Sequence, residues 1–312
     1  MRIAADDGTI LHTEQSSDPA ANITVVFVTG LNTTVIYWSR QRETLADLGR
    51  LVVFDHRGHG QSAESPLAGA TLGQLGRDVA AVIDAVAPTG AVVVVAHSVG
   101  ATAVLALAQQ RPELFGTRIV GVALLDAVES DWGRIGLRLP RFLTHVVVRL
   151  LWFTVPPLRR AFTDTTERRH RLRHAGGRTG PSGRRPWSGP LRRVRTLITS
   201  LRTMTLLSLL ADAALCDYSG GLESLGTTAV LVIAGDGDRF IPLRHKTAMA
   251  ARIPGARVLV VSDAGHLSSI TRPDIIDEAL RDFILRITER EHPQRIDRDQ
   301  PINRIVGVAD ND

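Results

Sequence analysis

Between residues 23 and 126, short apolar runs alternate with longer stretches in which apolar positions recur every three or four residues. The short runs are rich in Val and Ile and contain few polar positions, as expected for strands that helices cover on both faces. They lie at residues 23–28, 51–55, 91–96 and 119–126. This alternation is typical of βαβ units and predicts a mainly parallel sheet.

The longer stretches predict the helices that connect these strands. Their helical periodicity covers residues 37–48, 71–86 and 99–110, and a proline at position 112 follows the last of them. After residue 226 the pattern resumes, with strands at 229–234 and 257–261, a helix at 242–252 and a last helix at 273–289. At the N-terminus, a turn at Asp7-Gly8 separates two expected strands. The predicted fold class is α/β, with a mostly parallel, doubly wound sheet.

The segment 127–220 interrupts this pattern, because it contains no comparable strand. Residues 174–190 are rich in Gly, Pro and Arg and predict a loop, and residues 191–215 predict a basic amphipathic helix. Packing of this helix on the core is the simpler interpretation, and peripheral contact with a lipid surface is the alternative. We interpret 127–220 as a helical cap inserted into a core of residues 1–126 and 221–290, and 291–312 as a poorly ordered tail.

Composition narrows the class of protein. A chain of 312 residues that is 44% hydrophobic can bury a large core. Cys216 is the sole cysteine, which excludes an intramolecular disulfide. The most apolar stretch, residues 142–155, contains His145 and Arg149 and falls short of the roughly 20 residues of a spanning helix. With no apolar signal segment at the N-terminus, we expect a cytoplasmic location, with membrane association left open.

The positive charge comes almost entirely from arginine. The formal net charge is +5 and the pI is near 10.4, yet Lys246 is the only lysine. Neither a nucleic-acid recognition motif nor interleaved aromatic residues accompany this charge, so we expect no nucleic-acid partner. The oligomeric state stays open.

The segment VVVVAHSVG, residues 92–100, carries the strongest chemical signal. An apolar strand runs into a small-x-Ser-x-Gly turn and then directly into a helix, which is the context of a nucleophile elbow. Such a turn presents Ser98 at the carboxyl edge of the sheet. The start of the following helix directs N–H groups and a positive dipole end toward developing negative charge. Ser98 is therefore the candidate nucleophile.

Together with this turn, four further segments resemble the α/β-hydrolase family. FVTGL at 27–31 resembles its oxyanion loop, FDHRGHGQS at 54–62 its D-x-R-G-x-G-x-S stretch, GDGDRFIP at 235–242 its acid turn, and DAGH at 263–266 its histidine loop. The order Ser, Asp, His is also that of the family. The resemblance covers most of the chain outside the insertion.

The resemblance implies a role for each site residue. Ser98 attacks the substrate, His266 accepts and returns the proton, and Asp238 orients the imidazole. The backbone N–H groups of Val99 and Leu31 are the implied oxyanion hole.

Two other carboxylates compete with Asp238 for the role of acid. Asp236 lies in the same turn, and Asp126 ends the strand before the insertion, where some family members carry the acid. The G-x-x-D register favours Asp238.

A serine nucleophile favours acyl transfer over the chemistry of relatives that use aspartate at this position. We expect an esterase or lipase-like hydrolase that forms an acyl-enzyme on a small-molecule, hydrophobic acyl substrate. Such hydrolysis is expected to need no metal or organic cofactor, and His56, His59 and His97 lack metal-ligand spacing. A thioesterase, C–C bond hydrolase, acyltransferase or haloperoxidase-like perhydrolase using the same triad is the alternative, and a non-catalytic hydrolase-fold binding protein is a further one.

Overall fold

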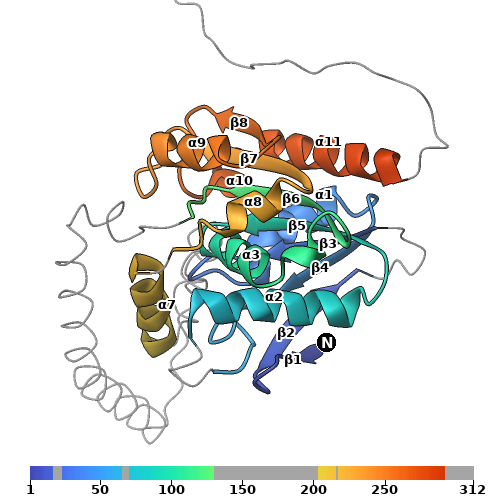
Figure 1. The fold of residues 1–312 in the computed structure, drawn as a ribbon, viewed down its shortest axis with the longest axis vertical. Coiled ribbons are helices and arrows are strands. Elements are labelled where there is room, and N and C mark those ends of the chain that lie inside the picture. The colour runs from blue at the N-terminus through green and yellow to red at the C-terminus, as the bar shows by residue number, and fades with distance from the viewer. Residues whose placement is uncertain (17–22, 65–69, 130–202, 216, 292–312) are drawn as a thin grey trace, which may run out of the picture.

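The computed structural model describes residues 1–16, 23–64, 70–129, 203–215 and 217–291 (Figure 1). Within them, one sheet has the strand order β1-β2-β4-β3-β5-β6-β7-β8. The strands are β1 (Arg2–Ala4), β2 (Ile10–Gln15), β3 (Ile23–Val28), β4 (Arg50–Phe54), β5 (Ala91–His97), β6 (Ile119–Leu125), β7 (Ala229–Gly235) and β8 (Arg257–Val261). The pairs β1/β2 and β2/β4 are antiparallel and all other pairs are parallel.

Helices cover both faces of this sheet. They are η1 (Val35–Trp38), α1 (Ser39–Thr44), α2 (Leu72–Val86), α3 (Val99–Gln110), η3 (Pro112–Leu114), α7 (Thr203–Leu215), α8 (Gly221–Leu225), α9 (Leu243–Ala251), α10 (Ser268–Thr271) and α11 (Pro273–Glu291). Side chains of α2, α3, α8 and α9 belong to the core of one face, and those of η1 and α11 to the core of the other. On the first face α2 lies beside α3 (Figure 1). The predicted doubly wound α/β class is confirmed.

Strand β5 is apolar from Ala91 to Ala96 because both of its faces are covered. Val92, Val94 and Ala96 join the core under α2 and α3, whereas Val93 and Val95 join the core under α11. Side chains alternate between the faces of a strand, so a strand covered on both sides has no solvent-facing position. The same rule accounts for the apolar runs of the neighbouring parallel strands.

The prediction of a helix at 37–48 is wrong in its limits. The chain forms the 3₁₀ turn η1 and then the short helix α1, which ends at Thr44. Gly49 has φ +154 and passes so close to β3 that a Cβ there would lie 2.6 Å from the Ile23 carbonyl oxygen. Glycine is therefore required at position 49, where the chain passes close to β3 before it enters β4.

Most of the predicted cap, residues 130–202, lies outside the described residues, as do the loop at 174–190 and the tail at 292–312. These assignments stay predictions. Of the predicted helix at 191–215, the described part is α7, in which Leu209 and Ala213 pack against α2 and against Val99. No described helix has the length and apolar character needed to cross a membrane.

A buried ion network holds the turn that follows β4. Arg57 is fully buried, and its guanidinium donates to both carboxylate oxygens of Asp78 on α2, at 2.5 and 2.6 Å. It also pairs with Asp7 in the β1–β2 turn, at 2.7 Å. The hydrogen bond from Arg57 holds the pKa of Asp7 well below its usual range, whereas burial raises the pKa of Asp78. Arg57 thus joins β4, α2 and the N-terminal hairpin.

We expect Arg57→Met to lower the free energy of unfolding by about 3–5 kcal/mol at pH 7, because Asp78 stays buried without its cation. The pKa of Asp7 is depressed in the folded state, so its contribution is present above the unfolded carboxyl pKa of about 3.9 and is lost as pH falls. The part of the difference that comes from Asp7 should therefore stay nearly constant from pH 7 to about pH 4 and shrink only below about pH 4.

Urea unfolding of both proteins at neutral pH and again below about pH 4 measures this difference. Arg281→Met is the matched control, because Arg281 pairs with the exposed carboxylate of Asp47 at 2.7 Å on the surface and should cost less than about 1 kcal/mol. Equal losses in the two variants would contradict the structural role of Arg57.

Candidate active site

Ser98 lies in a strained turn between β5 and α3. Its backbone has φ +54 and ψ −124, a conformation that residues with a Cβ rarely adopt. Gly100 is required nearby, because a Cβ there would lie 2.3 Å from the Thr29 carbonyl oxygen. The turn therefore has the geometry of a nucleophile elbow, with the serine at the carboxyl end of β5.

The structure brings the three predicted catalytic side chains into one hydrogen-bonded chain. Ser98 Oγ lies 2.8 Å from His266 Nε2, and His266 Nδ1 lies 2.8 Å from Asp238 Oδ2. Asp238 follows β7 and His266 follows β8, and the carboxyl ends of parallel strands meet at one edge of the sheet. A carboxylate only accepts hydrogen bonds, so Nδ1 carries the proton and Nε2 is free to accept from the hydroxyl.

Asp238 is buried and surrounded by donors. Its Oδ1 accepts the N–H groups of Phe240 and Ile241, at 2.8 and 3.0 Å, and its Oδ2 pairs with Lys246 Nζ at 2.7 Å. Burial opposes ionisation, but the His266 and Lys246 contacts and the Ile241 N–H outweigh it and hold the pKa of Asp238 well below its usual range. Asp238 is therefore ionised at neutral pH.

The two competing carboxylates lie in other environments. Asp236 is exposed to solvent. Asp126 is fully buried, and its carboxylate accepts from Gly235 N at 2.9 Å and from Lys246 Nζ at 2.6 Å. Within the described structure, Asp238 is the one of these three carboxylates that contacts His266.

The predicted oxyanion donors flank the elbow. Val99 is the first residue of α3, where an N–H group has no partner within the helix. The loop that carries Leu31 passes directly over the elbow, since a Cβ on Gly30 would lie 3.2 Å from Ser98 Cβ. Leu31 also packs against the cluster that contains Val99 and Leu209 of α7.

Two buried histidines from the turn after β4 hold the oxyanion loop. His56 Nε2 lies 2.8 Å from the Thr29 carbonyl oxygen, and the Asn32 N–H donates to His59 Nε2 at 3.2 Å. His59 Nδ1 lies 3.0 Å from the Arg57 carbonyl oxygen, so His59 is protonated on Nδ1 and accepts on Nε2. Burial lowers the pKa of both histidines, to about 3 for His56, which keeps them neutral. Sequence reasoning assigned this turn a structural role and missed its contact with the oxyanion loop.

His97 contacts the backbone of the loop that carries His266. It is buried, its Nε2 lies 2.8 Å from the His266 carbonyl oxygen, and its ring stacks on Tyr37 with centroids 4.7 Å apart. Burial lowers the pKa of His97 to about 4, with the charge of His266 acting in the same direction. A neutral His97 therefore donates to the backbone of His266.

Apolar side chains border His266. Phe240 is 70% exposed, and its ring centroid lies 5.4 Å from that of His266. Leu267 is also exposed. An open apolar surface next to the reactive groups is suited to contact with the apolar part of a substrate.

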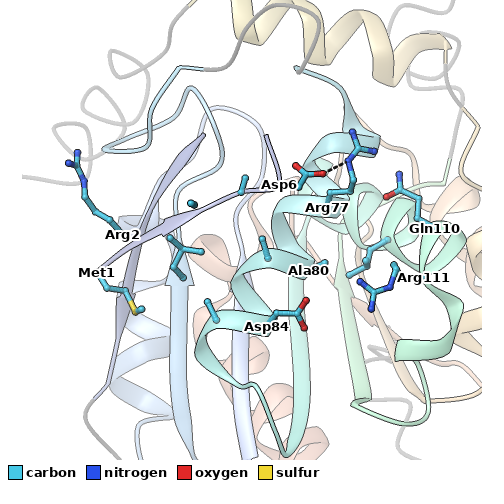
Figure 2. Close-up of a pocket in the computed structure, with 14 residues that line it drawn as sticks. Met1, Arg2, Asp6, Arg77, Ala80, Asp84, Gln110 and Arg111 are labelled. Carbon is cyan, nitrogen blue, oxygen red and sulfur yellow. Dashed lines mark ion pairs between the residues drawn. The ribbon is translucent and has the colours of Figure 1, made fainter. Parts of the chain in front are cut away.

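A separate pocket of about 940 Å³ lies beside β1, α2 and the end of α3 (Figure 2). Its lining includes the ion pair between Arg77 and Asp6, at 3.0 Å, and none of the three catalytic candidates. The described residues also contain no group of three or more His, Cys, Asp or Glu side chains suited to hold a metal ion.

A Ser-His-Asp chain at the carboxyl edge of a mostly parallel, doubly wound sheet defines the class of α/β-fold hydrolases. A sequence profile of the alpha/beta hydrolase fold matches residues 23–273, and this chain belongs to that family. The resemblance expected from the sequence is confirmed.

Relatives with hydrolase names extend over nearly the whole chain. RutD of Caulobacter segnis, named as a candidate carbamate hydrolase, is 26% identical over 274 residues, which cover 85% of this chain and 93% of RutD. Two solved structures are a thermophilic esterase from Thermogutta terrifontis (TM-score 0.65, 21% identity, 92% and 98% coverage) and the enol-lactonase from Burkholderia xenovorans LB400 (TM-score 0.67, 24% identity, 91% and 100% coverage). At these identities the two structures establish the fold alone.

Proposed function

We propose that this protein is a serine hydrolase that cleaves carboxylic esters through an acyl-enzyme on Ser98. The observation that carries this proposal is the unbroken hydrogen-bonded chain from Ser98 through His266 to Asp238. Membership in the α/β hydrolase fold family supports it further.

In the acylation step, Ser98 Oγ attacks the carbonyl carbon while His266 Nε2 takes the hydroxyl proton. The imidazolium that forms is stabilised by the ionised Asp238 on its other side. The carbonyl oxygen becomes an oxyanion, which the N–H groups of Val99 and Leu31 stabilise. His266 then protonates the leaving alkoxide, and the acyl group stays on Ser98.

Deacylation repeats these roles with water in place of Ser98. His266 takes a proton from the attacking water, the oxyanion forms again at the same donors, and Ser98 regains its proton as the acid product leaves. The balanced reaction is ester plus water to carboxylic acid plus alcohol.

A fluorescent organophosphonate tests the enzyme claim, because it phosphonylates an activated serine. We expect labelling of the native protein, and failure to label would overturn the proposal.

A chain-length series of p-nitrophenyl esters then tests which acyl groups the enzyme prefers. Phe240 and Leu267 next to His266 support a hydrophobic acyl group, so kcat/KM should rise with acyl length beyond acetate.

Carbamate cleavage is a second candidate function, favoured by RutD relatives of several bacteria that match more than four fifths of this chain. The same attack on the carbonyl carbon of a carbamate ester breaks the bond to the alkoxy group and gives a carbamoyl-enzyme and an alcohol. Comparison of kcat/KM for an aryl carbamate and the matching aryl ester decides between the two, because each candidate function predicts the larger value for its own substrate.

We expect His59→Ala to lower kcat about ten- to a hundredfold with little change in KM, because the variant lacks the acceptor that holds the Asn32 N–H. Initial rates over a range of ester concentrations separate the two constants. The control is His12→Ala, a partly buried histidine that contacts Glu14 and Gln61 rather than the oxyanion loop. A rise in KM alone, at unchanged kcat, would contradict a role of His59 in oxyanion stabilisation.

A further inference from the structure

The sole lysine of the chain is buried between two carboxylates. Lys246 lies on α9 with no exposed surface, and its Nζ is 2.6 Å from Asp126 Oδ1 and 2.7 Å from Asp238 Oδ2. It also donates to the Gly235 carbonyl oxygen, at 3.2 Å. All three hydrogens of the ammonium group therefore have acceptors.

The same oxygen of Asp238 accepts from Lys246 and from His266. The ammonium nitrogen and the imidazole Nδ1 are thus separated by no more than two hydrogen-bond lengths. At this distance, in a buried site, a full charge on one group strongly affects the protonation of the other. Lys246 is too deeply buried to touch a substrate, so any effect on catalysis must act through Asp238.

Among the described residues, three buried charged side chains and two buried neutral rings form the network around His266. Asp238 and Lys246 come from the β7–α9 region and Asp126 from the end of β6, while His97 and Tyr37 are held neutral by burial, since burial lowers the pKa of His97 to about 4 and raises that of Tyr37. Before proton transfer the group holds two negative charges and one positive charge. The net charge of these three groups is therefore −1. This negative charge is available to stabilise the imidazolium form of His266.

We propose that Lys246 is a positioning residue that fixes this charge balance: it compensates the charge of Asp126 and orients Asp238, so that one net negative charge is available to stabilise His266 when it takes the Ser98 proton. The catalytic part of this inference rests on the proposed function, but the charge balance does not. Removal of Lys246 leaves two carboxylates that favour imidazolium, and removal of the Asp126 charge leaves Asp238 balanced by Lys246, with no net negative charge to favour it.

Titration of the His266 ring nitrogens by ¹⁵N NMR tests this balance without any substrate, with His266→Ala to assign the signal. Relative to native protein, we expect the titration midpoint of His266 to rise by about one pH unit or more in Lys246→Met and to fall by a similar amount in Asp126→Asn. In the double variant Asp126→Asn/Lys246→Met, which removes both charges, the midpoint should return close to the native value. The pH dependence of phosphonate labelling should move in the same directions.

General loss of stability cannot produce opposite shifts that cancel. If Lys246→Met does not fold, Asp126→Asn and the double variant still test the sign and the cancellation. The proposal is overturned if the His266 titration midpoint in Asp126→Asn falls by less than about 0.3 pH unit, or if it rises. Shifts in the expected directions without phosphonate labelling would support the charge balance and reject the hydrolase function.

Discussion

We expect Ser98→Ala to lower kcat/KM for an activated ester by about 10⁴- to 10⁶-fold and to abolish phosphonate labelling, while the protein stays folded. In the proposed mechanism the Ser98 hydroxyl forms the acyl bond, and its Oγ lies 2.8 Å from His266 Nε2. The residual rate should come from the oxyanion donors and from substrate binding alone, acting on water. Alanine also fits the elbow, because the site already accommodates a Cβ at φ +54.

Steady-state kinetics on the purified variant measure this loss, and its circular dichroism spectrum checks the fold. Ser224→Ala on α8 is the control, since Ser224 lies outside the hydrogen-bonded chain. Retention of more than about a tenth of native activity by Ser98→Ala would mean that another group is the nucleophile.

We expect Asp238→Asn to lower kcat by about 10⁴-fold with a smaller effect on KM. The amide removes the negative charge that stabilises the imidazolium, and its N–H₂ can donate to Nδ1 and stabilise the wrong tautomer, with the proton on the side of Ser98. The pKa of Asp238 is held well below its usual range. The native enzyme should therefore not lose activity through protonation of Asp238 between pH 5 and pH 8.

Asp236→Asn is the matched control for this variant, because Asp236 lies in the same turn and faces solvent. It should keep kcat within about twofold of the native value. If the two variants lost similar activity, the assignment of the acid to Asp238 would fail, and the register of the turn would have to be reconsidered.

The elements nearest the site were predictable because their signals are local. The limits of β3, α3 and β8 agree with those expected from the apolar runs, and the elbow at Ser98 follows from a strand that meets a helix with a small turn between them. Burial on both faces of a parallel sheet leaves a clear record in sequence, because every position must be apolar. The choice of Asp238 over Asp236 and Asp126 also followed from local register.

The interactions that hold the site residues in place were not predictable, because the residues that form them are far apart in sequence. Lys246 contacts Asp126 across 120 positions, and His59 contacts Asn32 across 27. A lysine or histidine in a helix or turn is usually solvated or packed without a special role. The role of such a lysine or histidine depends on which strand ends meet at the same edge of the sheet.

By itself, the sequence determined the fold class and the turn at Ser98, and it predicted Ser98, Asp238 and His266 as the site residues, because short-range periodicity and motif spacing encode these features. Only the tertiary structure decided that Asp126 pairs with Lys246 rather than with His266, and that His56 and His59 hold the oxyanion loop. The physical reason is that burial of charged and polar groups requires partners, and those partners come from whichever segments the sheet brings together.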